Sequence, residues 1–337
     1  YLFYFYTLHY EEKIILKILL LGEFSGLHKD LKAGLVELGH EVTIASSGDG
    51  WKKIGSDIFF PDSGAGVSYN IKRRLKFLKL IMDFRGYDVV HLVSPFIFPM
   101  NIFPRFFVFR FLKCFNKKIF LSAAGSDSFF WSKGRENLAY GPFDDALRYD
   151  IKSGQSIFLT EKYKKYNEYI ANNVDGIIPI MYEYEVSYKG APNLLKTIPI
   201  AIDTSKITIQ PNIVGSKIVI FHGLNKYGFK GTRHVEEAFK ILNSKYSEKI
   251  ETIIDGKLPL NEYLKLMQKT NIVIDQTNSY SLGINGLIAL AMGKVVLGGA
   301  ENESLISHNI DTTPVINIKP DADDIVNKIE QLLSTEV

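Results

Sequence analysis

Short runs of aliphatic residues alternate along this chain with longer amphipathic stretches. The runs richest in Val, Ile and Leu lie at residues 17–22, 41–45, 88–94, 118–122, 176–179, 217–221, 271–275 and 295–296. Between some of them, apolar residues recur at helical spacing, as at 27–38, 233–242, 260–268 and 322–333. Apolar runs that alternate with amphipathic helices are typical of parallel strands joined by crossover helices. We therefore predict an α/β protein built on parallel sheets.

The length of the chain predicts two domains. With 337 residues, it exceeds what one hydrophobic core usually serves. The alternation of strands and helices starts again after residues 197–216, so we place the first domain at residues 1–200 and the second at 201–337. Residues 128–169 are rich in Tyr, Lys and Asp and interrupt the pattern of the first domain. We expect them to form a helical insertion.

The composition is that of an ordinary globular protein, with 46% hydrophobic and 23% charged residues. A single cysteine, Cys114, excludes an intramolecular disulfide and fits a reducing compartment, so we expect a cytoplasmic protein. No apolar run reaches the roughly 20 residues that a membrane-spanning helix needs. The aromatic start, residues 1–10, lacks the marks of a secretory signal. We interpret it as an extra strand or an extension.

Charge is distributed unevenly. From Lys72 to Lys118, eleven Lys and Arg stand against two Asp, a net charge of +9, whereas the whole chain carries only +3. Within this segment, residues 101–118 interleave six Phe with basic residues. Such a helix suits the headgroup region of an anionic membrane, so we expect a peripheral contact at the inner face. The alternative is a core-facing helix with solvated basic side chains. No nucleic-acid-binding motif accompanies the charge, which argues against nucleic acid as a partner.

Residues 280–299, YSLGINGLIALAMGKVVLGG, combine a glycine-bearing turn, a short helix of small apolar residues and a β-branched run after Gly293. This element resembles the donor site of GT-B glycosyltransferases, most closely retaining family 4, whose signature is E-G-F-G-L-P-L-L-E-A-M-A-x-G-x-P-V-V. The two glutamates of that signature fall at Tyr280 and Ile288, so the chain resembles a divergent member without the acidic pair.

Two further stretches carry the same resemblance. KILLLGEFSG and LVELGHEVTIAS, within residues 17–47, are similar to the opening strand, loop, helix and strand of GT-B enzymes. Residues 198–203, IPIAID, stand where the family has I-P-N-G-V-D. The resemblance extends over about residues 17–335. It implies two Rossmann-like domains that face each other across a cleft, with the last helix packing back towards the first domain.

The resemblance implies that a nucleotide sugar binds between the domains. Backbone N–H groups at helix N-termini and glycines that permit close approach would hold its diphosphate. Asp275 follows a strand, at the sheet edge where open α/β sheets bind ligands. Its alternative role is to anchor the following loop, and for each glycine the alternative is a tight turn. The expected donor-binding residues other than lysines are Gly22, Gly26, Asp275, Asn278, Ser279, Ser281 and Gly283.

Cations for the diphosphate are expected in residues 221–239. FHGLNKYGFKG is similar to the family's G-R-L-x-x-x-K-G, in which an Arg and a Lys grip the diphosphate. Lys230 matches the lysine, and we assign it to donor binding and catalysis. Leu224 occupies the arginine position, so Lys226 or Arg233 would substitute. A solvated surface lysine is the alternative for Lys226 and Lys230.

On the acceptor side, Ala124-Gly125-Ser126-Asp127 follows a strand and resembles the family's H-G-S-D. Asp127 is expected to contact the transferred sugar or the acceptor hydroxyl, or simply to cap the next helix. His91 is placed like the family's strand-end histidine, although a histidine in an apolar strand is often a core residue. The chain lacks His-Glu-x-x-His and His-x-x-Glu-His motifs, so we expect no metal requirement.

Together with these features, the resemblance implies a metal-independent hexosyltransferase that retains the anomeric configuration. It would move sugar from a nucleotide diphosphate to a cell-surface glycan or a lipid-linked acceptor, as in polysaccharide biosynthesis, and need no cofactor beyond this substrate. The alternative is a catalytically idle GT-B module that binds a glycan, a nucleotide or a protein partner. A sugar-nucleotide epimerase is less favoured, because the chain offers few acids and histidines for the cleft. A dinucleotide-dependent oxidoreductase is disfavoured by the absence of G-x-G-x-x-G after the first strand.

Overall fold

A computed structural model describes residues 14–60, 67–98, 105–209, 211–256, 258 and 260–334. The interpretation of residues 1–10 as an extra strand or an extension falls outside this described part. Within it, no helix combines the length and the apolarity needed to cross a bilayer.

The first sheet has six parallel strands. They are β1 (Lys17–Leu21), β2 (Glu41–Ser46), β3 (Ile58–Phe59), β4 (Val89–Leu92), β5 (Lys118–Ala123) and β6 (Gly176–Pro179). Their order is β3-β2-β1-β4-β5-β6, and Ile18 pairs with both Val42 and Val89. This is the strand order of a Rossmann fold, in which the direction of winding reverses between the first and fourth strands. The predicted strands of this domain are confirmed, and the short β3 is added.

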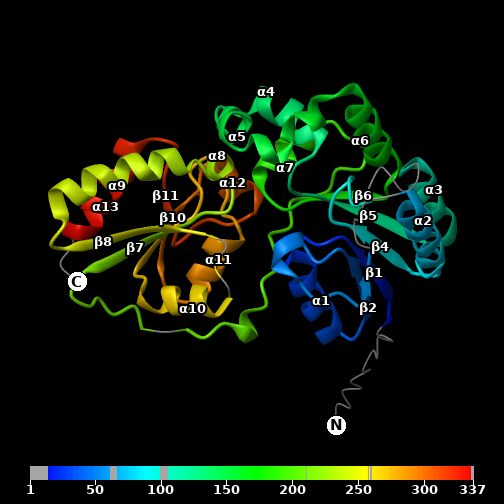
Figure 1. The fold of residues 1–337 in the computed structure, drawn as a ribbon, viewed down its shortest axis with the longest axis horizontal. Coiled ribbons are helices and arrows are strands. Elements are labelled where there is room, and N and C mark those ends of the chain that lie inside the picture. Colours follow the sequence, from blue (N-terminus) through cyan, green and yellow to red (C-terminus); the bar gives the residue numbers. More distant parts are fainter. Residues whose placement is uncertain are drawn as a thin grey trace, which may run out of the picture.

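Helices cover both faces of this sheet because successive residues of each strand point to opposite sides. Leu19 and Leu21 face the larger core, which α2 (Val67–Met82), α3 (Arg105–Phe115) and α6 (Glu161–Asn173) complete. Ile18 and Leu20 face α1 (Leu27–Glu37). Figure 1 shows α1 on one side of the sheet and α2 and α3 on the other.

The expected helical insertion lies between β5 and β6 and begins around the fully buried Trp131. Besides α6, it holds α4 (Arg135–Asn137), α5 (Phe143–Tyr149) and the short turns η2 (Phe130–Gly134), η3 (Ile151–Ser153) and η4 (Gln155–Leu159). The helix after β6, α7 (Tyr182–Tyr188), packs on η2. In Figure 1, α5 and α7 extend from the first domain towards the second.

The second sheet has five parallel strands. They are β7 (Ile218–Gly223), β8 (Ile250–Asp255), β9 (Ile272–Ile274), β10 (Val295–Gly298) and β11 (Ile316–Asn317), in the order β11-β10-β9-β7-β8. The winding reverses between β7 and β9, as in the flavodoxin-like strand order. The sequence predicted β7, β9 and β10 but not β8 or β11. The two sheets use separate parts of the chain, β1–β6 before residue 180 and β7–β11 after residue 217.

The helices of the second domain also form two layers. α9 (Thr232–Tyr246) and α13 (Ala322–Ser334) cover one face, and α10 (Leu260–Lys269) and α11 (Ile284–Ala291) cover the other. The shorter helices α8 (Tyr227–Lys230) and α12 (Asn302–Ser307) lie towards the first domain, where α8 packs on α5 and α12 on α7. The turn η5 (Thr204–Lys206) belongs to the connection between the domains.

From the resemblance we expected the last helix to pack back towards the first domain. The structure shows a different packing. α13 packs along α9, and its buried residues Ile325, Val326 and Ile329 belong to the core of the second domain. The reason is its amphipathic pattern, which places these apolar side chains on one face that the second sheet and α9 already bury.

Replacement of Ile325 by alanine tests this packing. Ile325 is fully buried, so Ile325→Ala should lower the free energy of unfolding of the second domain by about 2–5 kcal/mol. Urea denaturation of the full chain would measure the loss, with Asn327→Ala on the exposed side of the same helix as the control. Equal, small effects of the two substitutions would show that α13 is not held against α9.

Candidate functional site

The predicted ligand loops leave the two sheets where the winding reverses. Residues 22–26 follow β1 in the first sheet, whereas residues 224–226 follow β7 and residues 275–283 follow β9 in the second. Open α/β sheets bind ligands at the carboxyl ends of their strands at such points. Strand order alone therefore marks these loops as the candidate site.

Lys226 connects the candidate loops across the domain boundary. Its side chain is exposed, and Nζ lies 5.5 Å from the ring centroid of Phe229. Desolvation by the surrounding protein lowers the pKa of Lys226, and Asp150 and Asp49 of the first domain oppose that shift. Lys52 of the same domain is also close enough to interact with Lys226 electrostatically. Lys52 in turn donates a hydrogen bond to Ser25 in the loop after β1. A cation of the second domain thus stands opposite the first ligand loop.

Gly22 and Gly26 shape that loop through their backbone conformations. Their φ angles are +86° and +96°, values at which other residues are strained. The N–H groups of Gly26 and Lys29 at the start of α1 both donate to the carboxylate of Glu23, at 2.9 Å each. Burial raises the pKa of Glu23, and these backbone donors oppose the shift. The chain therefore caps this helix N-terminus itself, so the two glycines fit the tight-turn alternative.

Lys230 and Asp275 form a buried ion pair. Lys230 Nζ lies 3.1 Å from Asp275 Oδ1, and their side chains are 7% and 1% exposed. The second oxygen of Asp275 accepts the N–H of Gly283, at the start of α11, at 2.7 Å. Asp275 therefore anchors the loop that follows it, which was the alternative to donor contact. Lys230 makes an internal contact and is not a solvated surface lysine.

The loop of Ser279, Tyr280 and Ser281 holds a carboxylate of the first domain. Glu183 Oε1 accepts the N–H of Tyr280 at 2.6 Å, the N–H of Ser281 at 3.0 Å and the hydroxyl of Ser279. Glu183 Oε2 accepts the hydroxyl of Ser281 at 2.9 Å. Backbone N–H groups that converge in this way favour an anion. The sequence assigned this loop to donor phosphate, and in the structure an internal carboxylate occupies it.

Tyr280 and Ile288, which align with the family's two glutamates, both pack into apolar surroundings. The ring of Tyr280 stacks on Tyr140 of the first domain, with centroids 4.4 Å apart and planes 13° apart. The hydroxyl of Tyr280 accepts the N–H of Ala139 at 3.1 Å. Ile288 packs against the core of the second domain. At these two positions the chain has apolar packing instead of acidic groups.

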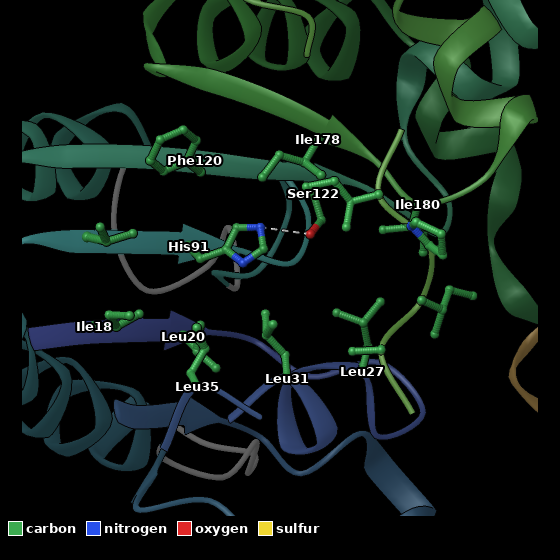
Figure 2. Close-up of a pocket in the computed structure, with 15 residues that line it drawn as sticks. Ile18, Leu20, Leu27, Leu31, Leu35, His91, Phe120, Ser122, Ile178 and Ile180 are labelled. Atoms are coloured by element: carbon green, nitrogen blue, oxygen red, sulfur yellow. Dashed lines mark hydrogen bonds between the residues drawn. The ribbon is translucent and has the colours of Figure 1, made fainter. Parts of the chain in front are cut away.

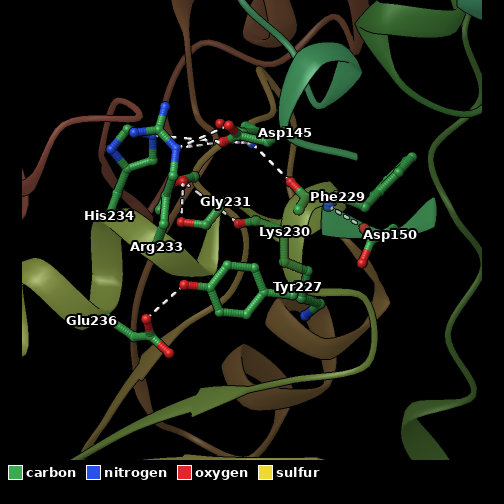
Figure 3. Close-up of polar contacts among 12 residues, drawn as sticks. Asp145, Asp150, Tyr227, Phe229, Lys230, Gly231, Arg233, His234 and Glu236 are labelled. Carbon is green, nitrogen blue, oxygen red and sulfur yellow. Dashed lines mark hydrogen bonds and ion pairs between the residues drawn. The ribbon is translucent and has the colours of Figure 1, made fainter. Parts of the chain in front are cut away.

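Two more acids of the first domain bind groups of the second (Figure 3). Both oxygens of Asp145 accept from Arg233 Nε at 2.9 Å, and one also accepts from Asn278 Nδ2 at 3.2 Å. Asp150 Oδ2 accepts the N–H of Phe229 at 2.8 Å. Arg233, the proposed substitute for the missing arginine, is thus paired within the protein, and so is Asn278.

Asp127 lies inside the first domain, away from the loops of the second. Its side chain is fully buried, where it accepts the N–H of Phe130 at 2.8 Å and the hydroxyl of Tyr188 at 2.7 Å. The bond to Phe130 caps the next helical turn, which was the alternative role. Burial raises the pKa of Asp127 to about 6, although these two donors oppose the shift.

His91 lines an apolar pocket between the first sheet and α1 (Figure 2). The pocket has a volume of about 230 Å³, and residues 198–201 close its side. Apolar side chains form its walls except for His91 and Ser122, whose Nε2 and Oγ lie 2.9 Å apart. Burial lowers the pKa of His91 to about 4, so the ring is neutral at pH 7. His91 lies beside the loop after β1, because its ring centroid is 5.2 Å from that of His28, whose Nδ1 is 2.8 Å from the carbonyl oxygen of Gly22.

The structure thus joins Lys230, Asp275 and Gly283 in one set of contacts, whereas acids of the first domain bind Asn278, Ser279 and Ser281. Lys226 is exposed. Glu183, Asp145 and Asp150 were missed because their partners are remote in sequence. Asp145 lies 88 positions from Arg233, and Glu183 lies 97 from Tyr280. The acids in the 128–169 insertion were the one available signal. Within the described residues, no group of three or more His, Cys, Asp or Glu is placed to hold a metal ion.

Comparison with known proteins gave matches at the level of structure. No family model matches the sequence, and no curated protein matches it. Solved structures that are similar include Anabaena HepE in complex with UDP and glucose, with a TM-score of 0.56, 12% identity, and coverage of 95% of this chain and 90% of that one. Sucrose-phosphate synthase from Thermosynechococcus elongatus has a TM-score of 0.56, 14% identity, and coverage of 94% and 90%.

A third similar structure is the UDP-GlcNAc 2-epimerase from Neisseria meningitidis bound to UDP-GlcNAc. Its TM-score is 0.50 at 14% identity, and the match covers 94% of this chain and 91% of that one. At such identities the matches show the fold alone. The chain has the GT-B fold, with two Rossmann-like domains, as the sequence predicted. Because the fold carries both transferases and an epimerase, function has to be argued from the site.

The raised pKa of Asp127 predicts a pH dependence of stability. An acid whose pKa is raised by folding stabilises the fold below its unfolded pKa of about 3.9, and this contribution is lost as the pH rises towards 6. Asp127→Asn removes the titration, so the free energy of unfolding of the variant relative to the parent should rise between pH 4 and pH 6 by up to ~3 kcal/mol. Denaturation at several pH values measures it, with exposed Asp83→Asn as the control. A difference that does not vary with pH would contradict the role of burial.

Proposed function

We propose that this protein transfers a sugar from a nucleoside diphosphate donor to a glycan or a lipid-linked acceptor. One observation carries the proposal. Ligand loops at the winding reversals of both sheets lie at the domain boundary, where the exposed Lys226 stands opposite Asp49 and Lys52. The similar HepE structure holds UDP and glucose, and the epimerase holds UDP-GlcNAc, which supports a nucleotide sugar as the ligand.

The donor's diphosphate would bind between Lys226 and the Ser279–Gly283 loop. Lys226 supplies positive charge, and the loop supplies N–H groups at the positive end of α11. These groups would stabilise the charge that develops on the leaving diphosphate, in place of a metal. Lys230 would act indirectly, because its ion pair with Asp275 fixes the loop that carries the N–H groups. Retention of configuration is part of the proposal and rests on the resemblance to retaining enzymes.

The apolar pocket of the first domain supports a lipid-linked acceptor. It starts beside Leu27, directly after the loop of Gly22 and Gly26, and its walls suit a hydrocarbon chain. His91 and Ser122 would offer the only polar contacts of this pocket lining. In this arrangement His91 recognises the acceptor, and Asp127 holds the fold of the first domain.

A basic and apolar surface on α2 and α3 supports contact with an anionic membrane. Leu75, Leu78 and Met82 of α2 and Phe106, Phe107 and Phe115 of α3 are all exposed. Exposed Lys76 and Lys79 lie among them on α2. The ends of the two helices are linked, because the N–H of Gly86 donates to the carbonyl oxygen of Phe115 at 2.9 Å. We propose that this surface holds a cytoplasmic protein at the inner face of the membrane, next to lipid-linked substrates.

A catalytically idle binding module is the second candidate, and the occupied loop favours it. Glu183 accepts the N–H groups of Tyr280 and Ser281 that would hold phosphate. Tyr280 stacks on Tyr140 at the position where the family has an acid near the sugar. The two candidates differ in turnover. A transferase releases nucleoside diphosphate from a nucleotide sugar when an acceptor is supplied, whereas an idle module binds the nucleotide and releases none.

Replacement of Lys226 tests the donor site. Lys226→Ala should weaken binding of nucleoside diphosphates such as UDP about tenfold, which corresponds to ~1.4 kcal/mol. Binding of the nucleoside alone should stay unchanged, because the lysine contacts only phosphate. Isothermal titration calorimetry measures both, with Lys240→Ala on the exposed side of α9 as the matched control. Equal losses for UDP and uridine, or no binding of any nucleoside diphosphate by the parent, would refute the assignment.

Vesicle binding tests the membrane surface. Co-sedimentation with vesicles that contain anionic lipid should fall steeply with salt, because the attraction is screened within about 10 Å at 0.1 M ionic strength. Charge reversal of Lys76, Lys79 and Arg110 to glutamate should abolish it. Reversal of Lys240, Lys245 and Lys249, in the second domain, serves as the control. Equal binding to neutral vesicles, or no binding by the parent, would leave α2 and α3 as ordinary core-facing helices.

A further inference from the structure

The carboxylate of Glu183 is buried without a cationic partner. The residue is 4% exposed, and no ion pair to it occurs in the described part of the chain. Its contacts are four neutral donors, two N–H groups and two hydroxyls, all from Ser279, Tyr280 and Ser281. Burial of a carboxylate is costly unless donors replace its water. These three residues therefore form a complete anion site of the second domain.

The occupant and the site belong to different domains. All four donors come from the loop after β9, whereas Glu183 comes from α7 of the first domain. The loop is also held by contacts within the second domain, because Asp275 accepts the N–H of Gly283 and the carbonyl oxygen of Tyr280 accepts the N–H of Glu301 at 3.1 Å. If the domains move apart, the carboxylate leaves and its donors face solvent.

We propose that Glu183 is an internal competitor for the phosphate of the donor, so that the site opens to ligand only when α7 withdraws. The proposal rests on the proposed function, because it states how that same donor site is regulated. A carboxylate and a phosphate both offer neighbouring oxygens to converging N–H groups. The phosphate carries the larger charge and can also use Lys226, which Glu183 does not contact in the structure.

Other carboxylates of the first domain act in the same direction. Asp145 binds Arg233 and Asn278, and Asp150 binds the N–H of Phe229. An anion that enters the domain boundary meets donors that already bind these acids. It must therefore displace the acids from the donors. Donor binding is therefore coupled to separation of α5 and α7 from the second domain. The apparent affinity for donor is reduced by the fraction of molecules in which these contacts are closed.

Glu183→Gln tests the competition, with inorganic pyrophosphate as the probe. The amide keeps the size of the side chain but loses its charge, and charged hydrogen bonds are about twice as strong as neutral ones. Calorimetric titration should therefore show about tenfold tighter pyrophosphate binding than the parent, equivalent to ~1.4 kcal/mol. Glu185→Gln is the control, because Glu185 accepts from Thr197 and Ser307 at the same boundary but outside the anion site. The pyrophosphate affinity of Glu185→Gln should stay within about twofold of that of the parent, because this substitution leaves Glu183 in place.

A second variant keeps the test decisive if Glu183→Gln does not fold. Ser279→Ala removes a hydroxyl of the anion site and should weaken pyrophosphate binding, whereas a purely structural loop would leave binding unchanged. Unchanged pyrophosphate affinity in folded Glu183→Gln, or an equal gain in Glu185→Gln, would overturn the proposal. The proposed function fails separately. If Glu183→Gln gains pyrophosphate affinity but neither it nor the parent binds a nucleotide sugar, the anion site stands and the sugar transferase does not.

Discussion

The buried carboxylate of Glu183 ties the two domains of this protein together. A carboxylate removed from water needs several donors, and four converge on it from one loop of the second domain. The stacking of Tyr140 on Tyr280 and the pairing of Asp145 with Arg233 depend on the same approach of the domains. The relative position of the domains, and hence access to the candidate site, follows from these polar contacts.

The fold could be predicted because its signals are local. Apolar runs and helical periodicity located most strands and the helices α1, α9, α10 and α13, since each pattern repeats within a few residues. Strand β8 was not predicted, because polar Glu251 and Thr252 interrupt its apolar run. The packing partner of α13 was predicted wrongly, because periodicity shows that a helix has a buried face but not which surface covers that face.

The candidate site was only partly predictable, because its contacts join segments that are distant in sequence. Motif spacing assigned Lys230, Asp275 and the Ser279–Gly283 loop to one donor site, and that role stays a prediction. In the structure Lys230 contacts Asp275, and Asp275 accepts the N–H of Gly283. Spacing could not show that Glu183 would fill the loop or that Asp127 would be buried, because both depend on contacts between distant segments. The fold places the loops at the boundary, whereas side chains from the other domain decide what they can bind.

Hydrogen exchange of α7 and of the Ser279–Gly283 loop would test the central claim most directly. Without ligand, the N–H groups of Tyr280 and Ser281 should exchange slowly, because Glu183 accepts both. With a saturating nucleoside diphosphate, the account predicts that α7 and α5 exchange faster while the loop stays protected by phosphate. If the nucleotide binds and α7, α5 and the loop all keep their original protection, Glu183 does not compete for the site and the account is contradicted.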